Sequence, residues 1–290
     1  MPHRLVCIAI LVFWSLAAGA LFTRDVLPDL MIGNPPDLRT ITASQTDANS
    51  EPTYWTIQVA EDPNLLNRRP VGQAETRSTL TPNGWVHLES KVRIDAGDLL
   101  KGTRFDTFHD EQLEVVSTYE INASGNLDSF WTAVKSAEEP GDLLTLEGKV
   151  TGDALEVKAK GPLPLFNWTR TLRYQPRGMV QNTLGPVDRM PGLQVGQRWE
   201  SRIVSPLTGR VETVRFEVAR KGTILWGNNP VAALEVVAKG GPMSLRLWVR
   251  PDGLVLRQEV PFPFVRLVIE RKPDRGTAGP AAADAQVFGP

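Results

Sequence analysis

The densest group of side chains that could do acid–base or metal chemistry lies between residues 106 and 111. It comprises Asp106, His109, Asp110 and Glu111. A metal site needs three or four converging ligands, and this segment offers one imidazole together with the carboxylates of a loop. We therefore expect a hydrated loop here rather than a metal centre. The sequence predicts neither a bound metal nor any other cofactor.

The remaining candidates for catalysis are few. His87 falls on the polar side of an alternating segment and is expected to be a solvated strand residue. Glu138 and Glu139 are adjacent, so an extended chain points them to opposite sides, unlike a paired acid and base. The single cysteine, Cys7, lies in the N-terminal apolar run, and neither a Gly-x-Ser-x-Gly elbow nor a Walker loop occurs. We therefore predict that the protein is not an enzyme.

One tryptophan falls on the polar face of its predicted strand and not on the core face. The aliphatic side chains of residues 245–249 share one face of an alternating segment. This leaves Trp248 with Arg246 and Arg250 on the other face, where a partner or a second layer could cover them. We expect that one of the two guanidinium groups stacks on the indole ring. The alternative is that these three residues form a binding surface.

Alternation with a period of two runs through residues 54–272 and predicts strands. It is clearest in residues 86–94, 155–160, 214–218 and 245–250, and it is typical of an antiparallel sheet with one wet face and one covered face. Turn dipeptides such as Asn83-Gly84 separate these runs. We therefore expect a mainly-β protein built on a curved antiparallel sheet, either a half-barrel or two tandem β-meanders, with few short helices.

The core and two local segments follow from the same pattern. Residues 127–134 are ambiguous, because their apolar positions fit helical spacing while Phe130 and Trp131 also favour a strand. A single helical turn is expected at residues 98–101. Most of the tryptophans are expected to fill the concave interior of the sheet. The predicted core includes Leu88, Val92, Val157, Phe216, Val218, Leu245 and Leu247.

The apolar run Leu5–Phe22 fixes the compartment. It follows Arg4 and is just long enough for a membrane-spanning helix, but Ala18-Gly19-Ala20 also gives it the layout of a cleavable secretory signal. We favour an uncleaved signal anchor, and in either case the positive-inside rule exports the rest of the chain. The predicted localisation is the inner (cytoplasmic) membrane, crossed once, with the bulk of the chain periplasmic or extracellular.

Composition and the positions of Pro- and Gly-rich stretches divide the chain into five segments. We predict a signal anchor or signal peptide at residues 1–22, a flexible linker at 23–52, a first β-rich half at 53–188, a second β-meander half at 189–272 and a disordered tail at 273–290. With 32 Lys and Arg against 33 Asp and Glu, the formal net charge is −1. The charges are interspersed rather than gathered on a basic face, so the sequence argues against nucleic-acid binding.

Three segments carry a resemblance to a known kind of protein. They are Pro191-Gly-Leu-Gln-Val-Gly-Gln-Arg-Trp199, Val204-Ser-Pro-Leu-Thr-Gly209 and Leu247-Trp-Val-Arg-Pro-Asp-Gly-Leu-Val-Leu-Arg-Gln-Glu259. Residues 54–272 resemble the exported β-domain that precedes the catalytic domain of bacterial transglutaminase-like proteins. They are similar, more loosely, to the curved-sheet periplasmic proteins related to lipoprotein carriers. The enzymes of the first group use a Cys-His-Asp triad, and no exported cysteine is available here, so no catalytic role is carried over.

Three functions are compatible with these observations. The first is a membrane-anchored, non-enzymatic β module outside the cytoplasm that binds or positions another envelope component. The second is a carrier or sensor of an acyl chain or other apolar ligand in a half-barrel. The third is an unrecognised hydrolase. An interior filled by tryptophan favours the first, an open apolar interior the second, and convergent carboxylates the third. The expected partners are the membrane and an envelope protein or apolar ligand.

Overall fold

The computed structural model describes residues 51–273 apart from 61–64, 66, 101–110, 138–140, 163, 165–166, 175–184, 205–210, 241–242 and 263–264. The predicted anchor at 1–22 lies outside these residues, as do nearly all of the predicted linker and tail. Within the described ranges, no helix is long and apolar enough to cross a bilayer.

Strands make up almost all of the regular structure. The strands of the first half are β1 (Thr53–Ala60), β2 (Arg68–Leu80), β3 (Val86–Asp95), β4 (Gln112–Ile121), β5 (Leu127–Ser136), β6 (Asp142–Thr151), β7 (Ala154–Lys160) and β8 (Trp168–Arg173). Those of the second half are β9 (Arg198–Val204), β10 (Val211–Trp226), β11 (Asn229–Gly240), β12 (Met243–Val249), β13 (Val255–Phe262) and β14 (Val265–Arg271). The mainly-β prediction is confirmed.

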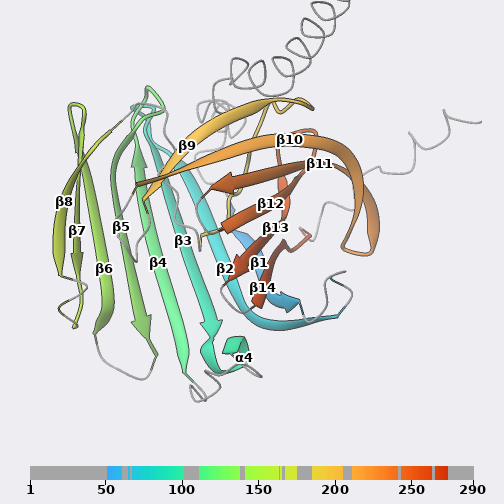
Figure 1. Ribbon diagram of the computed structural model, residues 1–290, viewed down its shortest axis with the longest axis horizontal. Coiled ribbons are helices and arrows are strands. Elements are labelled where there is room, and N and C mark those ends of the chain that lie inside the picture. The colour runs from blue at the N-terminus through green and yellow to red at the C-terminus, as the bar shows by residue number, and fades with distance from the viewer. Residues whose placement is uncertain are drawn as a thin grey trace, which may run out of the picture.

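The described strands form one curved antiparallel sheet of 14 strands, in the order β8-β7-β6-β5-β4-β3-β2-β1-β14-β13-β12-β11-β10-β9. It consists of two meanders, β1–β8 and β9–β14, joined where the first and last strands pair, with Trp55 opposite Arg271. Figure 1 shows β3 to β8 as a broad wall and β9 to β14 as a tighter curl beside it. The two ends of the folded chain therefore meet in the middle of the sheet, and β8 and β9 form its two edges.

The main core lies on one face of this sheet. Five of the predicted core residues are buried, and Leu88 and Leu245 are half-buried. Of the five buried residues, Val157 belongs to a second cluster, and the four in the main core are Val92, Phe216, Val218 and Leu247. Trp55 and Trp199 are 0 % and 1 % exposed, and the ring of Trp199 stacks on that of Phe216 with a centroid distance of 5.1 Å. Large side chains from both meanders thus fill this interior, as expected of close-packed cores.

A second apolar cluster covers the same face of the wall, on β5, β6 and β7. It includes Phe130, Leu146 and Val157, and Val134 packs against both clusters. Gly148 lies directly beneath the ring of Phe130, where an added Cβ would be only 1.9 Å from the ring atom Cε1. The missing side chain of Gly148 therefore lets the Phe130 ring lie flat over the neighbouring strand.

The two uncertain segments are now settled. Residues 127–134 lie within strand β5, which pairs with β4 and β6 along its length; this tertiary pairing outweighs the helical spacing. The predicted helical turn at residues 98–101 falls in α4 (Ala96–Leu100), although Lys101 lies outside the described residues. The carboxylate of Asp95 accepts a hydrogen bond from the Asp98 amide at 2.8 Å, the usual capping of a helix start.

Strand β10 bends and folds over the opposite face of the sheet. Its register shifts between Val218 and Arg220, as at a β-bulge, which bends a strand and strengthens its twist. Beyond the shift, Ile224 and Trp226 form a small separate core with Leu256, and the indole of Trp248 packs against this core. Figure 1 shows the strong curvature of β10 at this end of the molecule.

Candidate functional site

Two of the predicted reactive groups cannot be placed. Asp106, His109 and Asp110 fall within residues 101–110, and Glu138 and Glu139 fall within 138–140, all outside the described residues. Glu111 is described, and its backbone carbonyl accepts a hydrogen bond from the Ala96 amide at 2.8 Å. Over the described residues, no group of three or more His, Cys, Asp or Glu side chains could hold a metal ion.

His87 lies between two carboxylates on the outward face of the wall. Its Nδ1 is 2.6 Å from Glu120 and its Nε2 is 3.0 Å from Glu89. Burial works to lower the pKa of His87, but the hydrogen bonds and charges of these two carboxylates outweigh it, and the pKa is raised above its ordinary value. A raised pKa leaves a smaller fraction of the imidazole neutral at a given pH, and only the neutral ring can act as a general base. The arrangement is that of a surface ion-pair cluster.

The predicted surface at Trp248 is largely covered by the chain itself. As the alternation predicted, Trp248 lies on the face opposite to Leu247 and Val249. The end of β10 crosses this face, and a Cβ added at Gly222 would come within 3.4 Å of the Trp248 ring. The indole N–H donates to Glu259 at 3.1 Å. The polar end of this ring is therefore engaged inside the protein.

Arg246 lies beside Trp248 in an alternating chain of charges. It contacts Glu235 at 2.9 Å and Glu259 at 3.4 Å, and these carboxylate side chains are only 7 % and 6 % exposed. Arg220 binds the second oxygen of Glu235 at 2.5 Å. The four carboxylate oxygens thus each have a donor: two guanidinium groups on Glu235, and Arg246 and the Trp248 indole on Glu259.

These two buried carboxylates converge, but their surroundings differ from those of an acid–base pair. General acid catalysis needs a carboxyl group that can hold a proton, and general base catalysis needs an oxygen free to accept one. Here each carboxylate oxygen is already bonded to a cationic or indole N–H. The carboxylates are buried, while the side chains of Arg220 and Arg246 are 69 % and 47 % exposed, so solvent screens these ion pairs in part. The arrangement links the neighbouring strands β10, β11, β12 and β13 across one face of the sheet.

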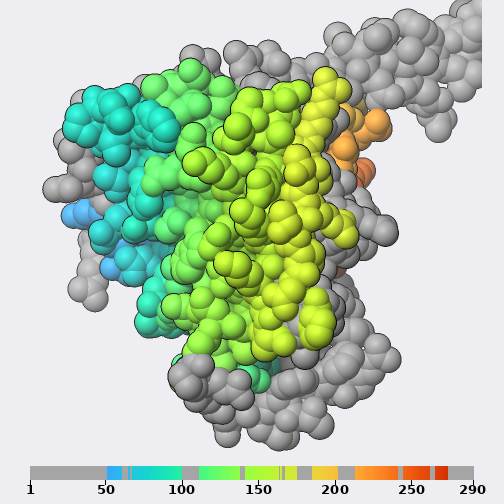
Figure 2. Space-filling model, turned by 90° about the vertical axis from the view of Figure 1, so that its left-hand side faces the viewer, coloured from blue at the N-terminus to red at the C-terminus, as the bar shows by residue number. Residues whose placement is uncertain are grey.

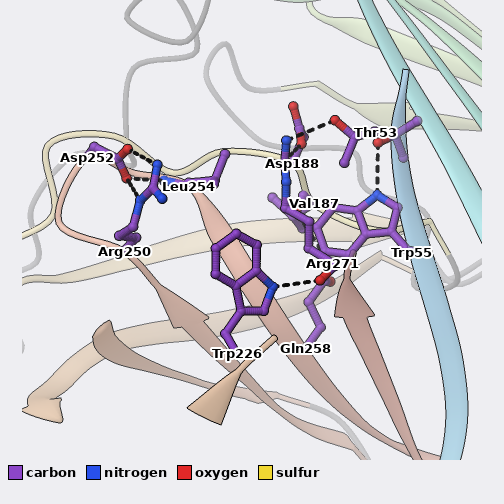
Figure 3. Close-up of polar contacts among 11 residues, drawn as sticks. Thr53, Trp55, Val187, Asp188, Trp226, Arg250, Asp252, Leu254, Gln258 and Arg271 are labelled. Carbon is purple, nitrogen blue, oxygen red and sulfur yellow. Dashed lines mark hydrogen bonds and ion pairs between the residues drawn. The ribbon is translucent and has the colours of Figure 1, made fainter. Parts of the chain in front are cut away.

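Arg250 belongs to a different part of the structure. Its guanidinium forms two hydrogen bonds with Asp252, at 2.9 Å and 2.5 Å, within the turn between β12 and β13. The hydrogen bonds from Arg250 lower the pKa of the Asp252 carboxyl. Figure 3 shows this pair at a distance from Trp226 and Arg271. Of the predicted surface, Trp248 and Arg246 therefore share Glu259, while Arg250 stabilises its own turn.

The residue that sequence reasoning missed is Arg271, at the end of β14. Its side chain is 7 % exposed and ion-pairs with Asp188. It also donates to Thr53 at 3.0 Å and lies over the ring of Trp55 at 5.7 Å from the centroid. Figure 3 shows these groups converging, with the Trp226 indole donating to the Arg271 carbonyl at 2.6 Å. No local pattern could reveal the set, because its members are far apart in sequence.

The segment around Asp188 crosses the core face of the sheet. The carbonyl of Val187 accepts a hydrogen bond from Gln258 at 3.3 Å, and the amide of Met190 donates to Gly253 at 2.7 Å. Gly253 has φ of +87°, and an added Cβ would be 2.6 Å from Pro191. A side chain at Gly253 would therefore push this segment away. Val187 and Met190 themselves belong to the main core.

The strands at the two ends of the sheet differ from the rest. Among the described strands, β8 pairs only with β7 and β9 only with β10. Edge strands present a row of backbone N–H and C=O groups that another strand can pair with. Four of the six residues of β8 are exposed: Thr169, Arg170, Thr171 and Arg173.

Comparison with known proteins gives a fold and no family. No family model matches the sequence, and no curated protein matches it. Among solved structures, the chain is similar to a β-barrel-like protein of a domain of unknown function, DUF1849, from Brucella abortus, at 8 % identity and a TM-score of 0.50. The likeness covers 78 % of this chain and 97 % of that one. At this identity it shows the fold alone: a long, curved, barrel-like antiparallel sheet.

Proposed function

We propose that this chain is a membrane-anchored, non-enzymatic β module outside the cytoplasm that binds or positions another component of the cell envelope. The observation that carries the proposal is the filled interior. Trp55 and Trp199 are fully buried in the main core, and the segment from Val187 to Met190 packs into the same space. A module whose core face is filled by its own side chains interacts through its outer surface and edges.

The placement outside the cytoplasm rests on sequence. The apolar run Leu5–Phe22 and the preceding Arg4 support it through the positive-inside rule. The resemblance to the exported β-domains of transglutaminase-like proteins supports it further, since those domains work outside the cytoplasm. The salt bridges and the indole hydrogen bond that hold Glu235 and Glu259 support a structural, non-enzymatic role for these two carboxylates.

A carrier of an apolar ligand is the second candidate, and one observation favours it. Several apolar residues next to the second cluster are only partly buried: Tyr119, Val134, Val150, Trp168 and Leu172. Trp168 and Leu172 lie on the edge strand β8 and Val150 on β6, where an acyl chain could contact them. The looser resemblance to lipoprotein-carrier proteins agrees with this role. In the carrier, the ligand would be bound at this end of the sheet rather than in the tryptophan-filled main core.

Native mass spectrometry of the full chain, released from mild detergent, separates these two functions. The binding module should give the mass of the polypeptide alone. A stoichiometric additional mass of an acyl-containing molecule would contradict it in favour of the carrier.

The hydrolase alternative has its own test. Replacing Asp106, His109, Asp110 and Glu111 together with alanine should leave biological activity intact. If the variant folds normally but loses a turnover that the wild-type chain shows, the protein is an enzyme and the proposed function is wrong.

A further inference from the structure

Among the described strands, β8 is the last strand of the wall, and four of its six residues are exposed. Its described neighbour is β7 alone, and the pairing runs from Ala154 opposite Arg173 to Ala159 opposite Trp168. Figure 2 shows β8 at the right-hand border of the outward face, next to the green strands of the wall. Since backbone groups alternate in direction along a strand, about half of those on β8 point away from β7.

Strands β7 and β8 at this edge carry an excess of positive charge. Strand β8 carries Arg170 and Arg173 and has no carboxylate, while β7 adds Lys158 and Lys160 against the single Glu156. The whole chain has a formal net charge of −1, so this excess of positive charge is local. It lies on both faces of the edge: Arg170 shares a face with Trp168, while Arg173 lies on the other face.

The cations on this edge disfavour a second copy of the same strand. Two β8 strands side by side would bring the arginines of both together, and like charges opposite one another destabilise a sheet. Charged side chains are a common protection of edge strands against such self-pairing. A strand with carboxylates in the corresponding positions would instead form cross-strand ion pairs.

The side chains of β8 also indicate which residues such a strand would carry. Trp168 and Leu172 are half-buried and point to the core face, with Arg170 between them. The Arg170 guanidinium lies over the Trp168 ring at 5.5 Å from the centroid. Directly opposite residues in a sheet lie within contact distance. Apolar side chains facing Trp168 and Leu172, and a carboxylate facing Arg170, would complement this edge.

We propose that the β8 edge is the docking site of this module, and that its partner is an acidic, extended protein segment that adds a strand to the sheet. Main-chain hydrogen bonds would supply affinity, and the alternating side chains would supply specificity, as in other cases of strand addition. The inference rests on the proposed function and names the surface and the partner chemistry for it.

The test uses the full chain in mild detergent and labelled acidic peptides, followed by fluorescence anisotropy. One face of the peptide strand carries Val, Glu and Val, to lie opposite Trp168, Arg170 and Leu172, and the other face carries Glu, to lie opposite Arg173. The acidic peptide should bind at least about 10-fold more tightly than the same peptide with Lys in place of Glu, and added salt should weaken it. An acidic peptide N-methylated at alternate residues should lose binding, because it cannot pair along the strand.

Arg173→Glu should reduce binding of the acidic peptide about 10-fold or more, as charge pairs across an interface set specificity. Arg77→Glu, a reversal at an exposed position on β2, should leave binding unchanged.

Three results would overturn the docking site: no binding of the acidic peptide at about 1 mM, equal binding of the N-methylated peptide, or the same effect from Arg173→Glu and Arg77→Glu. These outcomes differ from failure of the proposed function. A bound acyl ligand or a turnover would overturn the function itself, whereas a partner that contacts another face would overturn only the docking site.

Discussion

Removing the ring of Phe216 should destabilise the protein far more than removing its exposed neighbour. Phe216 is 4 % exposed in the main core, and its ring is parallel to that of Trp199 within 4°. Phe216→Ala loses apolar burial and leaves a cavity, which costs about 3–5 kcal/mol. Arg215 lies next to it on the solvent side, with a side chain that is 65 % exposed and ion-paired to Glu200. An exposed pair contributes about 0–1 kcal/mol, so Arg215→Ala should be nearly silent.

Urea unfolding of residues 51–290, followed by circular dichroism, measures both changes. The midpoint should fall for Phe216→Ala with an unchanged slope m, since the surface exposed on unfolding stays similar. Phe216→Leu keeps most of the volume and should cost less than about 1.5 kcal/mol. A loss below about 1 kcal/mol for Phe216→Ala, or equal losses for Phe216→Ala and Arg215→Ala, would refute the reasoning that places this ring in the core.

Three further results are expected. Alkaline phosphatase fused after Ser50 should be active, and an inactive fusion with an active cytoplasmic reporter would reverse the predicted topology. Because the pKa of His87 is raised in the folded state, its charged form stabilises the fold below about pH 6.5, and this stabilisation is lost as pH rises through the folded-state pKa. The difference in unfolding free energy between the wild-type chain and His87→Gln, measured by urea titration, should therefore shrink towards alkaline pH. A difference that grows with pH would contradict the ion-pair geometry. Gly148→Ala should cost about 1–3 kcal/mol by displacing the ring of Phe130; in a double-mutant cycle the cost should largely disappear in a Phe130→Ala background, and full additivity would show that the two do not touch.

Much of the fold follows from local pattern. The alternation in residues 86–94 and 245–249 lies within β3 and β12, and it places Val92 and Leu247 in the core. The alternation of apolar and polar residues was informative there because each strand has one covered and one solvated face. Residues 127–134 were ambiguous for the opposite reason, since their apolar spacing also fits a helix and only pairing with β4 and β6 decides between the two.

The candidate site was less accessible to sequence reasoning, because its contacts are long-range. Trp248 was placed on the correct face, but nothing near it indicates that the end of β10 folds over it. The register of β10 shifts after Val218, before this end of the strand. Arg271 meets Thr53 and Asp188 because β1 pairs with β14. Each of these residues is unremarkable in its own segment, and only the sheet order brings them together.

The central claim is that this module acts by binding a partner through its exposed surface. Crosslinking in living cells tests this claim most directly. A photo-reactive phenylalanine analogue would replace Thr171, which is exposed on β8, and Thr223, which is exposed on β10, in two versions of the full chain. After irradiation, the version with the probe at 171 should form a discrete adduct with another envelope protein, while the version with the probe at 223 should not. If neither position forms an adduct and the chain stays uncrosslinked, the account of a binding module with its docking edge at β8 is contradicted.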